Sequence, residues 1–368
     1  MLLYLRRSLH LVFNPILVNL AFVTTKPTGI TTYATNLLPQ IQSLNPILLT
    51  SQSIGNYTCY PVPPNLTPDQ GTQGHMRRLL WTQIRLPRIY QQLRSRLIFS
   101  PVPEAPLFSN CRYIVTVHDV IPLRFPKPFS PLTPYHRHYI PQVLAQAQHI
   151  LCNSTATAKD ITDFYHISAR KITPILLAHD SNHFRHLNLQ PRNYFLYIGR
   201  QDPYKNLSRL IASFAALPNC RDYELWLVGS TDSRYTPTLK AAIDSLGITS
   251  QVKFLNYVPY SQLPTIINSA IALVFPSLWE GFGLPVLEAM ACGTPVITSN
   301  LASLPEVAGD AALLIDPYNV GEITAAMQTL ATDAATRSHL AALGLARASL
   351  FSWAKTGIAT AEVLARYL

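Results

Sequence analysis

The chain has 368 residues, of which 48% are hydrophobic and only 13% are charged. This composition excludes a disordered chain, and the length suits two domains better than a single core. The formal net charge of +10 favours anionic partners, namely polyanions, nucleotide phosphates or an anionic membrane surface. The five cysteines are scattered and odd in number, which indicates free thiols and a cytoplasmic protein.

Residues 1–17 are predicted to form a separate N-terminal extension. The apolar stretches on either side of Arg6 and Arg7 look like a secretory signal peptide. The second stretch is interrupted by Asn14 and Pro15, is too short to span a bilayer, and is not followed by a small-residue cleavage site. We therefore expect an extension that packs on the fold or contacts a membrane surface.

From residue 18 onward, short apolar runs alternate with helical patterns, which predicts an α/β fold with doubly wound sheets. The predicted strands of the first half are residues 18–24, 46–52, 96–101, 113–119, 149–154 and 171–178. Those of the second half are residues 194–200, 224–230, 252–258, 270–275, 294–299 and 311–315. The predicted helices of the second half are residues 207–217, 236–247, 261–269, 284–292 and 320–332.

A polar break at residues 179–193 separates the two halves and is the candidate hinge. Each half is predicted to be Rossmann-like, with domain bounds at residues 18–185 and 186–350. A ligand is expected in the cleft between two such domains.

Glycines and acids gather in residues 279–295. The apolar run before them, residues 271–275, predicts a buried parallel strand whose carboxyl end opens into a loop, where open α/β sheets bind ligands. Gly281 and Gly283 allow a backbone to approach a ligand closely, and a helix beginning near Leu284 points free N–H groups at the same place. The segment is therefore predicted to hold an anion or a sugar.

This segment resembles the retaining glycosyltransferases of family 4, also called group 1, whose signature is two glutamates separated by seven residues, as Glu280 and Glu288 are here. The resemblance covers about residues 18–368 and is sharpest from Tyr194 onward. It implies a GT-B fold, in which two Rossmann-like domains face each other across a cleft. It also implies that residues 351–368 form a closing helix that crosses back to the N-terminal domain.

The resemblance assigns both glutamates to the donor. It implies that Glu288 accepts hydrogen bonds from the ribose and that Glu280 meets hydroxyls of the transferred sugar. Backbone N–H groups of Phe282, Gly283 and Leu284 would bind sugar or phosphate oxygens. The plainer interpretation is a first-turn carboxylate that favours the helix dipole and an ordinary exposed loop acid, respectively.

Two cations form the second informative motif. A predicted strand ends at Gly199, and Arg200 and Lys205 follow in the loop before a helix that Asn206 is expected to cap. Arginine offers a planar fork to a diphosphate and lysine a mobile point charge. In the family, the matching residues neutralise the donor phosphates, and stabilising the charge that develops on the leaving phosphate is the main catalytic task. Two solvated loop cations are the plainer interpretation.

The first half supplies two further candidates. His118, at the end of a predicted strand, resembles the "HD" segment of family members that act on mannose-type donors, where the matching residue contacts the donor sugar near its reacting carbon. Gly29 lies in a loop that matches a glycine-containing loop beside the donor diphosphate, although Thr31 stands where a second glycine is frequent. A capping or surface histidine is the plainer interpretation of His118.

No Asp-x-Asp motif and no His/Cys cluster with metal-ligand spacing is present in the sequence. We therefore expect no metal and no cofactor, with a GDP- or UDP-linked sugar as the substrate. The resemblance further implies a front-face retaining mechanism, in which the leaving phosphate itself accepts the proton of the acceptor.

Residues 75–96 contain six arginines and no acid, interleaved with apolar side chains. Part of this stretch is predicted to form a basic amphipathic surface that suits lipid headgroups or a polyprenyl diphosphate acceptor. Pro87 is expected to break any single helix across it, and a solvated face is the plainer interpretation. Peripheral association with the cytoplasmic face of the inner membrane follows from the first interpretation, and no nucleic acid partner is expected.

The sequence thus predicts a metal-independent hexosyltransferase, with mannose a candidate sugar and a glycan or lipid-linked acceptor, in polysaccharide or cell-envelope biosynthesis. Two other functions fit the same features. One is a GT-B sugar-nucleotide epimerase or glycan phosphorylase. The other is a non-catalytic basic scaffold that binds membranes or nucleic acids.

Overall fold

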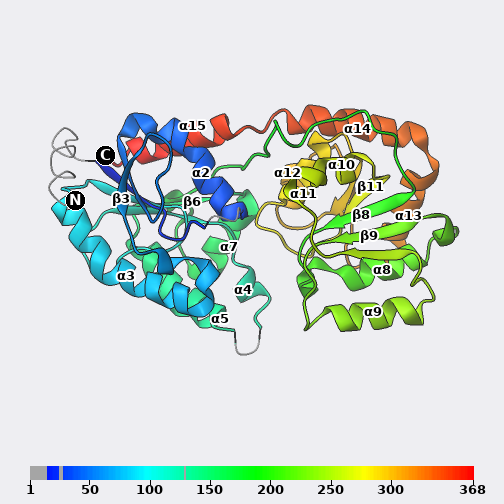
Figure 1. Ribbon diagram of the computed structural model, residues 1–368, viewed down its shortest axis with the longest axis horizontal. Coiled ribbons are helices and arrows are strands. Elements are labelled where there is room, and N and C mark those ends of the chain that lie inside the picture. The colour runs from blue at the N-terminus through cyan, green and yellow to red at the C-terminus, as the bar shows by residue number, and fades with distance from the viewer. Residues whose placement is uncertain (1–14, 25–27, 128–129) are drawn as a thin grey trace. The chain divides into compact units, whose positions relative to one another are not determined.

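The computed structural model describes residues 15–24, 28–127 and 130–368. Most of the predicted N-terminal extension lies outside these residues, as do Lys26 and Pro27 of the loop before Gly29. The chain forms two compact units (Figure 1). Unit 1 runs to Leu176 and includes Trp353–Leu368, and unit 2 is Leu177–Ser352.

In the described residues, unit 1 is built on a seven-stranded parallel sheet of order β3-β2-β1-β4-β5-β6-β7. Its strands are β1 (Ile16–Asn19), β2 (Pro46–Thr50), β3 (Thr58–Pro61), β4 (Leu97–Ser100), β5 (Tyr113–Val117), β6 (His149–Cys152) and β7 (Ile172–Pro174). The central strands are apolar along their whole length because both faces of a parallel sheet are covered by helices. Val18 pairs with Leu48 on one side and with Phe99 on the other, and all three are fully buried.

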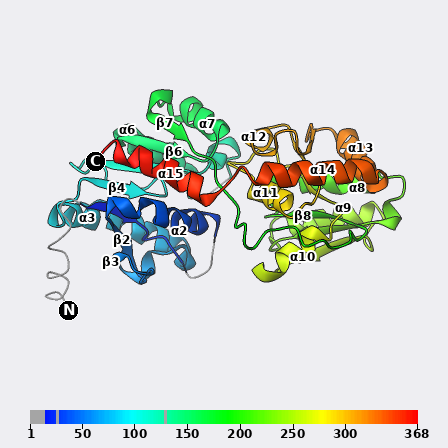
Figure 2. The same cartoon turned by 90° about the horizontal axis from the view of Figure 1, so that it is seen from above.

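The helices of unit 1 cover both faces of this sheet, with α2 and α15 on one face and α3 on the other (Figures 1 and 2). They are α2 (Gly29–Ile41), α3 (Gly71–Gln92), α4 (Ile121–Arg124), α5 (Leu132–Pro134), the π-helical turn Tyr135–Tyr139, α6 (Ile140–Gln146), α7 (Thr155–Tyr165) and α15 (Trp353–Ala365). The C-terminal α15 packs against α2 so closely that a Cβ at Gly357 would lie 2.8 Å from the Cβ of Gln40. Its Thr356 hydroxyl donates to the Leu176 carbonyl at 2.7 Å.

Pro87 does not break the segment that contains it. The structure has one continuous helix, α3, with Pro87 inside it, so the predicted break is wrong. A proline inside a helix costs about 3 kcal/mol. Burial of Trp81, Leu86 and Ile89 on the inner face offsets this cost, since each large apolar side chain contributes about 1.5–3 kcal/mol.

Arg78 is not part of a basic surface either. Its side chain is buried, and its Nε and Nη2 donate to the two carboxylate oxygens of Glu104, each at 2.7 Å. Nη1 donates to the Leu66 carbonyl at 2.9 Å. The pair joins α3 to the segment that follows β4, so one of the six arginines has a structural role.

Unit 2 contains, in its described residues, a six-stranded parallel sheet of order β10-β9-β8-β11-β12-β13. Its strands are β8 (Tyr194–Ile198), β9 (Glu224–Val228), β10 (Val252–Leu255), β11 (Ala272–Phe275), β12 (Val296–Ser299) and β13 (Leu313–Ile315). Its helices are α8 (Leu207–Ala215), α9 (Thr236–Ser245), α10 (Leu263–Asn268), α11 (Leu284–Ala291), α12 (Leu304–Ala308), α13 (Val320–Thr332) and α14 (Ala334–Ala348). In Figure 1, α8 and α9 lie on one face of the sheet and α11 and α14 on the other.

Candidate active site

Two loops that are far apart in the sequence meet in unit 2. Strands β8 and β11 are neighbours in the sheet, with Leu273 paired to Leu196. Because both strands run in the same direction, the loops at their carboxyl ends start side by side. A backbone hydrogen bond of 2.7 Å from the Leu278 N–H to the Tyr204 carbonyl then ties the loops together. Both sets of candidate residues in the second half of the chain therefore lie at one edge of one sheet.

Lys205 and Glu280 form an ion pair across these loops. Their Nζ and Oε1 atoms lie 2.6 Å apart, and each side chain is only 11% exposed. The ammonium also lies 5.4 Å from the centre of the Phe275 ring. An ammonium has three N–H donors, so pairing with one carboxylate oxygen leaves donors for an anion. The interpretations of Lys205 as a solvated loop cation and of Glu280 as an exposed acid are therefore wrong.

Arg200 is held at its backbone and reaches into solvent with its side chain. The Tyr197 hydroxyl donates to its carbonyl at 2.7 Å, and burial raises the pKa of Tyr197 well above its usual value, which keeps that hydroxyl protonated. The Arg200 side chain is 72% exposed, and its Nε donates to the buried carboxylate of Asp202 at 2.9 Å. Asp202 therefore fixes the orientation of the guanidinium through Nε, and the rest of the guanidinium is accessible from solvent.

Gly199 makes this turn possible. Its φ is 155°, and its N–H donates to the Val228 carbonyl at 2.9 Å. A Cβ at this position would lie 2.7 Å from the Tyr197 hydroxyl oxygen, the same atom that holds the Arg200 carbonyl. A side chain at Gly199 would thus displace the anchor of Arg200.

Asn206 stands at the N-cap of α8, but it does not cap the helix as the sequence predicted. Its φ is 64°, and its side chain makes no capping hydrogen bond. Instead Nδ2 donates to the carbonyls of Pro276, at 3.1 Å, and Pro317, at 2.6 Å. Asparagine tolerates the left-handed conformation, so it can end the Lys205 turn and also brace the loop that follows β11.

The loop between Glu280 and Gly283 is held from below by Ser303. The fully buried Ser303 hydroxyl lies 3.0 Å from the Glu280 carbonyl and 2.8 Å from the Phe282 carbonyl. The Phe282 side chain is 4% exposed and packs edge-on against Phe351, so only its backbone can face a ligand. Sequence reasoning missed Ser303, because nothing in its local pattern marks contacts with residues more than twenty positions away.

Gly283 is the N-cap of α11, and Leu284 is the first residue of the helix. Gly283 has a φ of 104°, and the cap makes no side-chain hydrogen bond. The first turn of a helix carries N–H groups without intrahelical acceptors and a partial positive charge, which suit an anion. Gly281 and Gly283 therefore lie between Glu280 of the ion pair and Leu284, at which α11 begins, and the predicted helix start near Leu284 is confirmed.

Replacing Gly283 with alanine is expected to lower the free energy of unfolding by about 2 kcal/mol, because it combines left-handed strain with overpacking. The new Cβ would lie 2.6 Å from Cδ2 of the buried Leu304. Urea denaturation measures the loss. Gly247→Ala is the matched control, since Gly247 has a φ of 68° but no atom within 4 Å of the new Cβ. Equal losses in the two variants would mean that the contact with Leu304 has no effect.

Glu288 lies in the second turn of α11, since the first turn contains no acid. The side chain is partly buried, and this burial raises the pKa of its carboxyl to about 7. The interpretation of Glu288 as a first-turn carboxylate is therefore wrong. Burial makes the ionised form of this carboxyl unfavourable unless a hydrogen-bond donor stabilises it.

In unit 1, His118 follows the carboxyl end of β5. Its Nε2 lies 2.8 Å from the Pro101 carbonyl, and its ring packs edge-on against Tyr33 at 4.9 Å between centres. Burial lowers the pKa of His118 to about 4, so the ring is neutral near pH 7. A carbonyl oxygen can only accept, so Nε2 carries the proton and Nδ1 is an acceptor. His118 therefore supplies no positive charge, but it can receive a hydrogen bond from a hydroxyl.

Gly29 is the first residue of α2. The N-cap Thr28 accepts a hydrogen bond from the Thr31 N–H at 3.2 Å, and Gly29 itself is exposed. Its φ is not among the positive values of the chain, so its backbone does not require glycine. Gly29 thus lies at the exposed start of a thirteen-residue helix.

Within the described parts of the chain, no group of three or more His, Cys, Asp or Glu side chains is placed to hold a metal ion. Over the same residues, no helix is both long and apolar enough to cross a membrane.

Comparison with known proteins decides the family. The family description "Glycosyltransferase Family 4" matches residues 28–181, and "Glycosyl transferases group 1" matches residues 179–344. The chain is 33% identical over 257 residues to the O-antigen chain mannosyltransferase B of Escherichia coli, covering 66% of this chain and 67% of that protein. The chain belongs to the group 1 glycosyltransferases of family 4.

Two further likenesses agree with this assignment. The O-antigen chain mannosyltransferase RfbU of Salmonella typhimurium is 29% identical over 259 residues, which cover 69% of this chain and 71% of RfbU. Among solved structures, Anabaena HepE in complex with UDP and glucose superposes with a TM-score of 0.74 and 18% identity, covering 96% of this chain and all of HepE. The predicted GT-B fold and glycosyltransferase class are thereby confirmed, and they are favoured over the epimerase, phosphorylase and scaffold alternatives.

Proposed function

We propose that this glycosyltransferase is a retaining enzyme that moves mannose from a nucleotide diphosphate sugar to a glycan or lipid-linked acceptor in cell-envelope polysaccharide synthesis. The observation that carries the proposal is the buried Lys205–Glu280 pair beside the N-terminus of α11. It joins a cation suited to phosphate with an acceptor suited to sugar hydroxyls. The mannose assignment is supported by the names of the O-antigen relatives.

Each candidate residue of unit 2 has a role in this proposal. Lys205 and the exposed guanidinium of Arg200 bind the diphosphate, together with backbone N–H groups at the start of α11. Glu280 accepts hydrogen bonds from the transferred sugar. Glu288 accepts from the ribose hydroxyls, and its ionised form is the stronger acceptor.

In this reaction the main task of the protein is to stabilise the negative charge on the leaving diphosphate, and the protein does not itself transfer a proton. When the bond between the anomeric carbon and the phosphate oxygen breaks, its electron pair stays on the phosphate, and the diphosphate gains one negative charge. The acceptor hydroxyl attacks the same face of the sugar and passes its proton to that phosphate oxygen. Lys205 and Arg200 stabilise the charge without a metal ion, and neutral His118 orients a sugar hydroxyl through Nδ1.

The donor experiment is a panel of GDP-mannose, UDP-glucose, UDP-galactose, GDP and UDP, measured by calorimetry and thermal shift. We expect at least one diphosphate to bind and to raise stability by about 2.7 kcal/mol at a hundred times its Kd. NMR of the product made from GDP-mannose should show an α-linked mannoside with retained configuration. Failure of every nucleotide to bind would overturn the proposal, and an inverted linkage would overturn the retaining mechanism.

Peripheral association with the cytoplasmic face of a membrane belongs to the same proposal, because a polyprenyl-linked acceptor remains in the bilayer. The formal charge of +10 supports contact with anionic lipid. A nucleic acid partner forms no part of it.

A further inference from the structure

Helix α3 exposes apolar side chains that its own unit does not use. Met76, Leu80 and Ile84 are 59%, 61% and 45% exposed. Their spacing of four residues places them in one stripe along the helix. The opposite face, with Trp81 and Ile89, is already buried against unit 1. The three side chains of the stripe therefore do not contribute to the hydrophobic core of unit 1.

Arginines flank this stripe on one side. Arg77 and Arg88 are exposed, and at 3.6 residues per turn they project within roughly 20° of each other around the helix, next to Ile84. The helix contains no acidic residue, and Arg78 is turned inward to Glu104. The outer face of α3 is thus apolar and cationic, without the acids that a solvated helix face usually carries.

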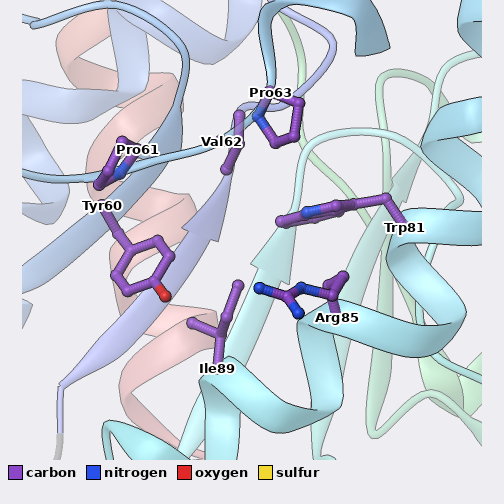
Figure 3. A pocket seen from close by; sticks show the side chains of 7 residues that line it. All are labelled: Tyr60, Pro61, Val62, Pro63, Trp81, Arg85 and Ile89. Atoms are coloured by element: carbon purple, nitrogen blue, oxygen red, sulfur yellow. The ribbon is translucent and has the colours of Figure 1, made fainter.

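A pocket lies beside the same helix, between α3 and the end of β3. Its volume is about 460 Å³, and it is lined by Tyr60, Pro61, Val62, Pro63, Trp81, Arg85 and Ile89. Figure 3 shows Trp81 and Arg85 projecting from α3 toward the segment that carries Tyr60, whose hydroxyl points to the side of Ile89 and Arg85. One guanidinium and one phenol among apolar walls suit a phosphate group attached to an apolar body.

We propose that the outer face of α3 docks on an anionic lipid bilayer. Met76, Leu80 and Ile84 enter the boundary between headgroups and acyl chains, while Arg77 and Arg88 contact lipid phosphates. Arg85 binds a headgroup phosphate at the mouth of the pocket. The inference rests on the proposed function for its purpose, since a lipid-linked acceptor is reached at such a surface.

Charge and shape favour a lipid surface over other occupants. Apolar side chains beside arginines match the boundary of an anionic membrane, where each cation strengthens binding about fivefold. Three apolar side chains on one helix form a small contact surface for a protein partner, whereas a bilayer accepts an apolar stripe of any shape.

The test is co-sedimentation of the full chain with vesicles. We expect binding to phosphatidylcholine vesicles that contain about a quarter phosphatidylglycerol, weak binding to pure phosphatidylcholine, and loss of binding in 1 M salt, where the Debye length falls to about 3 Å. Equal binding to neutral and anionic vesicles, or no binding to either, would overturn the proposal.

Two variants locate the surface. Arg77→Gln with Arg88→Gln should lower the vesicle partition coefficient roughly 25-fold. Leu80→Ser with Ile84→Ser should lower it by at least tenfold, because it removes two apolar side chains from the interface. Each variant needs an unchanged circular dichroism spectrum and melting temperature. Wild-type binding by either correctly folded variant would contradict the assignment to α3.

The matched control takes the same residue types from unit 2. Arg221→Gln with Leu246→Ser removes one exposed cation and one side chain that is 45% exposed, as Ile84 is. This control should bind vesicles as the wild type does, and a loss equal to that of the α3 variants would overturn the proposal.

Two further measurements are needed. One distinguishes lipid phosphate from soluble phosphate as the ligand of the pocket, and the other distinguishes failure of the docking surface from failure of the proposed function. If inorganic phosphate bound the wild type but vesicles did not, the pocket would be a site for soluble phosphate and membrane docking would fall. Calorimetry with the nucleotide panel is run on every variant. Intact nucleotide binding without vesicle binding overturns the docking surface and the peripheral association but leaves the proposed glycosyl transfer standing. Vesicle binding without any nucleotide binding overturns the proposed glycosyl transfer and leaves the docking surface standing.

Discussion

Replacing Lys205 with methionine is expected to lower turnover by about 10³-fold, with a much smaller change in the affinity for the intact donor. Methionine keeps the length of the side chain and removes the charge. The positive charge matters most when the phosphate gains its extra negative charge, so its loss is felt in the transition state more than in the ground state. Steady-state kinetics with the donor found by the nucleotide panel measures kcat and KM separately.

The same substitution also leaves the Glu280 carboxylate buried without its partner, which costs about 3 kcal/mol of stability. The double variant, Lys205→Met with Glu280→Gln, should recover most of this stability but not the turnover. Lys240→Met, at an exposed position of α9, is the control for loss of one lysine. Near-normal turnover in the single variant, or recovery of turnover together with stability in the double variant, would contradict a role for Lys205 in stabilising phosphate charge.

Glu288→Gln is expected to stabilise the free protein above pH 7 by up to about 3 kcal/mol. Burial raises the pKa of Glu288 from 4.5 to about 7, so the folded protein holds the proton more tightly than the unfolded chain does. The penalty for ionising this buried carboxyl is absent below pH 4.5, grows as the pH rises to 7, and is complete above it. Glutamine is neutral throughout and avoids the penalty.

The stability difference between variant and wild type should therefore grow between pH 5 and pH 8 in urea denaturation. At pH 8 the same variant should bind nucleoside diphosphates roughly 10- to 100-fold more weakly, because hydrogen bonds to a charged acceptor are lost. Glu362→Gln, at an exposed position of α15, is the control for both measurements. A pH-independent stability difference would contradict the raised pKa, and unchanged affinity would contradict the ribose role.

Sequence patterns predicted the bounds of helices and strands correctly where the pattern was long or was bounded by residues that end regular structure. The predicted helix at residues 320–332 matches α13, whose N-cap Asn319 accepts from the Glu322 N–H. Predicted strands mostly ended too late, as at β8, which stops at Ile198, because the last residues of each run already form the loop at the carboxyl edge. Strand β3 was missed since Thr58–Pro61 is a short edge strand without a buried apolar run.

In the candidate site, local features could be predicted from the sequence, whereas contacts between distant residues could not. Glycine spacing and the two glutamates were visible in the sequence because turns and helix starts are local features. The Lys205–Glu280 pair was not, since its members lie 75 positions apart and meet only because β8 and β11 are neighbours in the sheet. The same holds for the bracing contacts of Asn206 and Ser303.

By itself, the sequence determined the alternation of strands and helices, the two Rossmann-like halves, the family, and the candidate residues of the site. These follow from local periodicity, turn chemistry and motif spacing, which act over a few residues. Only the tertiary structure decided that Lys205 is paired, that burial raises the pKa of Glu288 and lowers that of His118, and that Arg78 is buried while Arg77 and Arg88 are exposed. Charge state and exposure depend on which distant segments exclude water from a side chain, and strand order sets that arrangement.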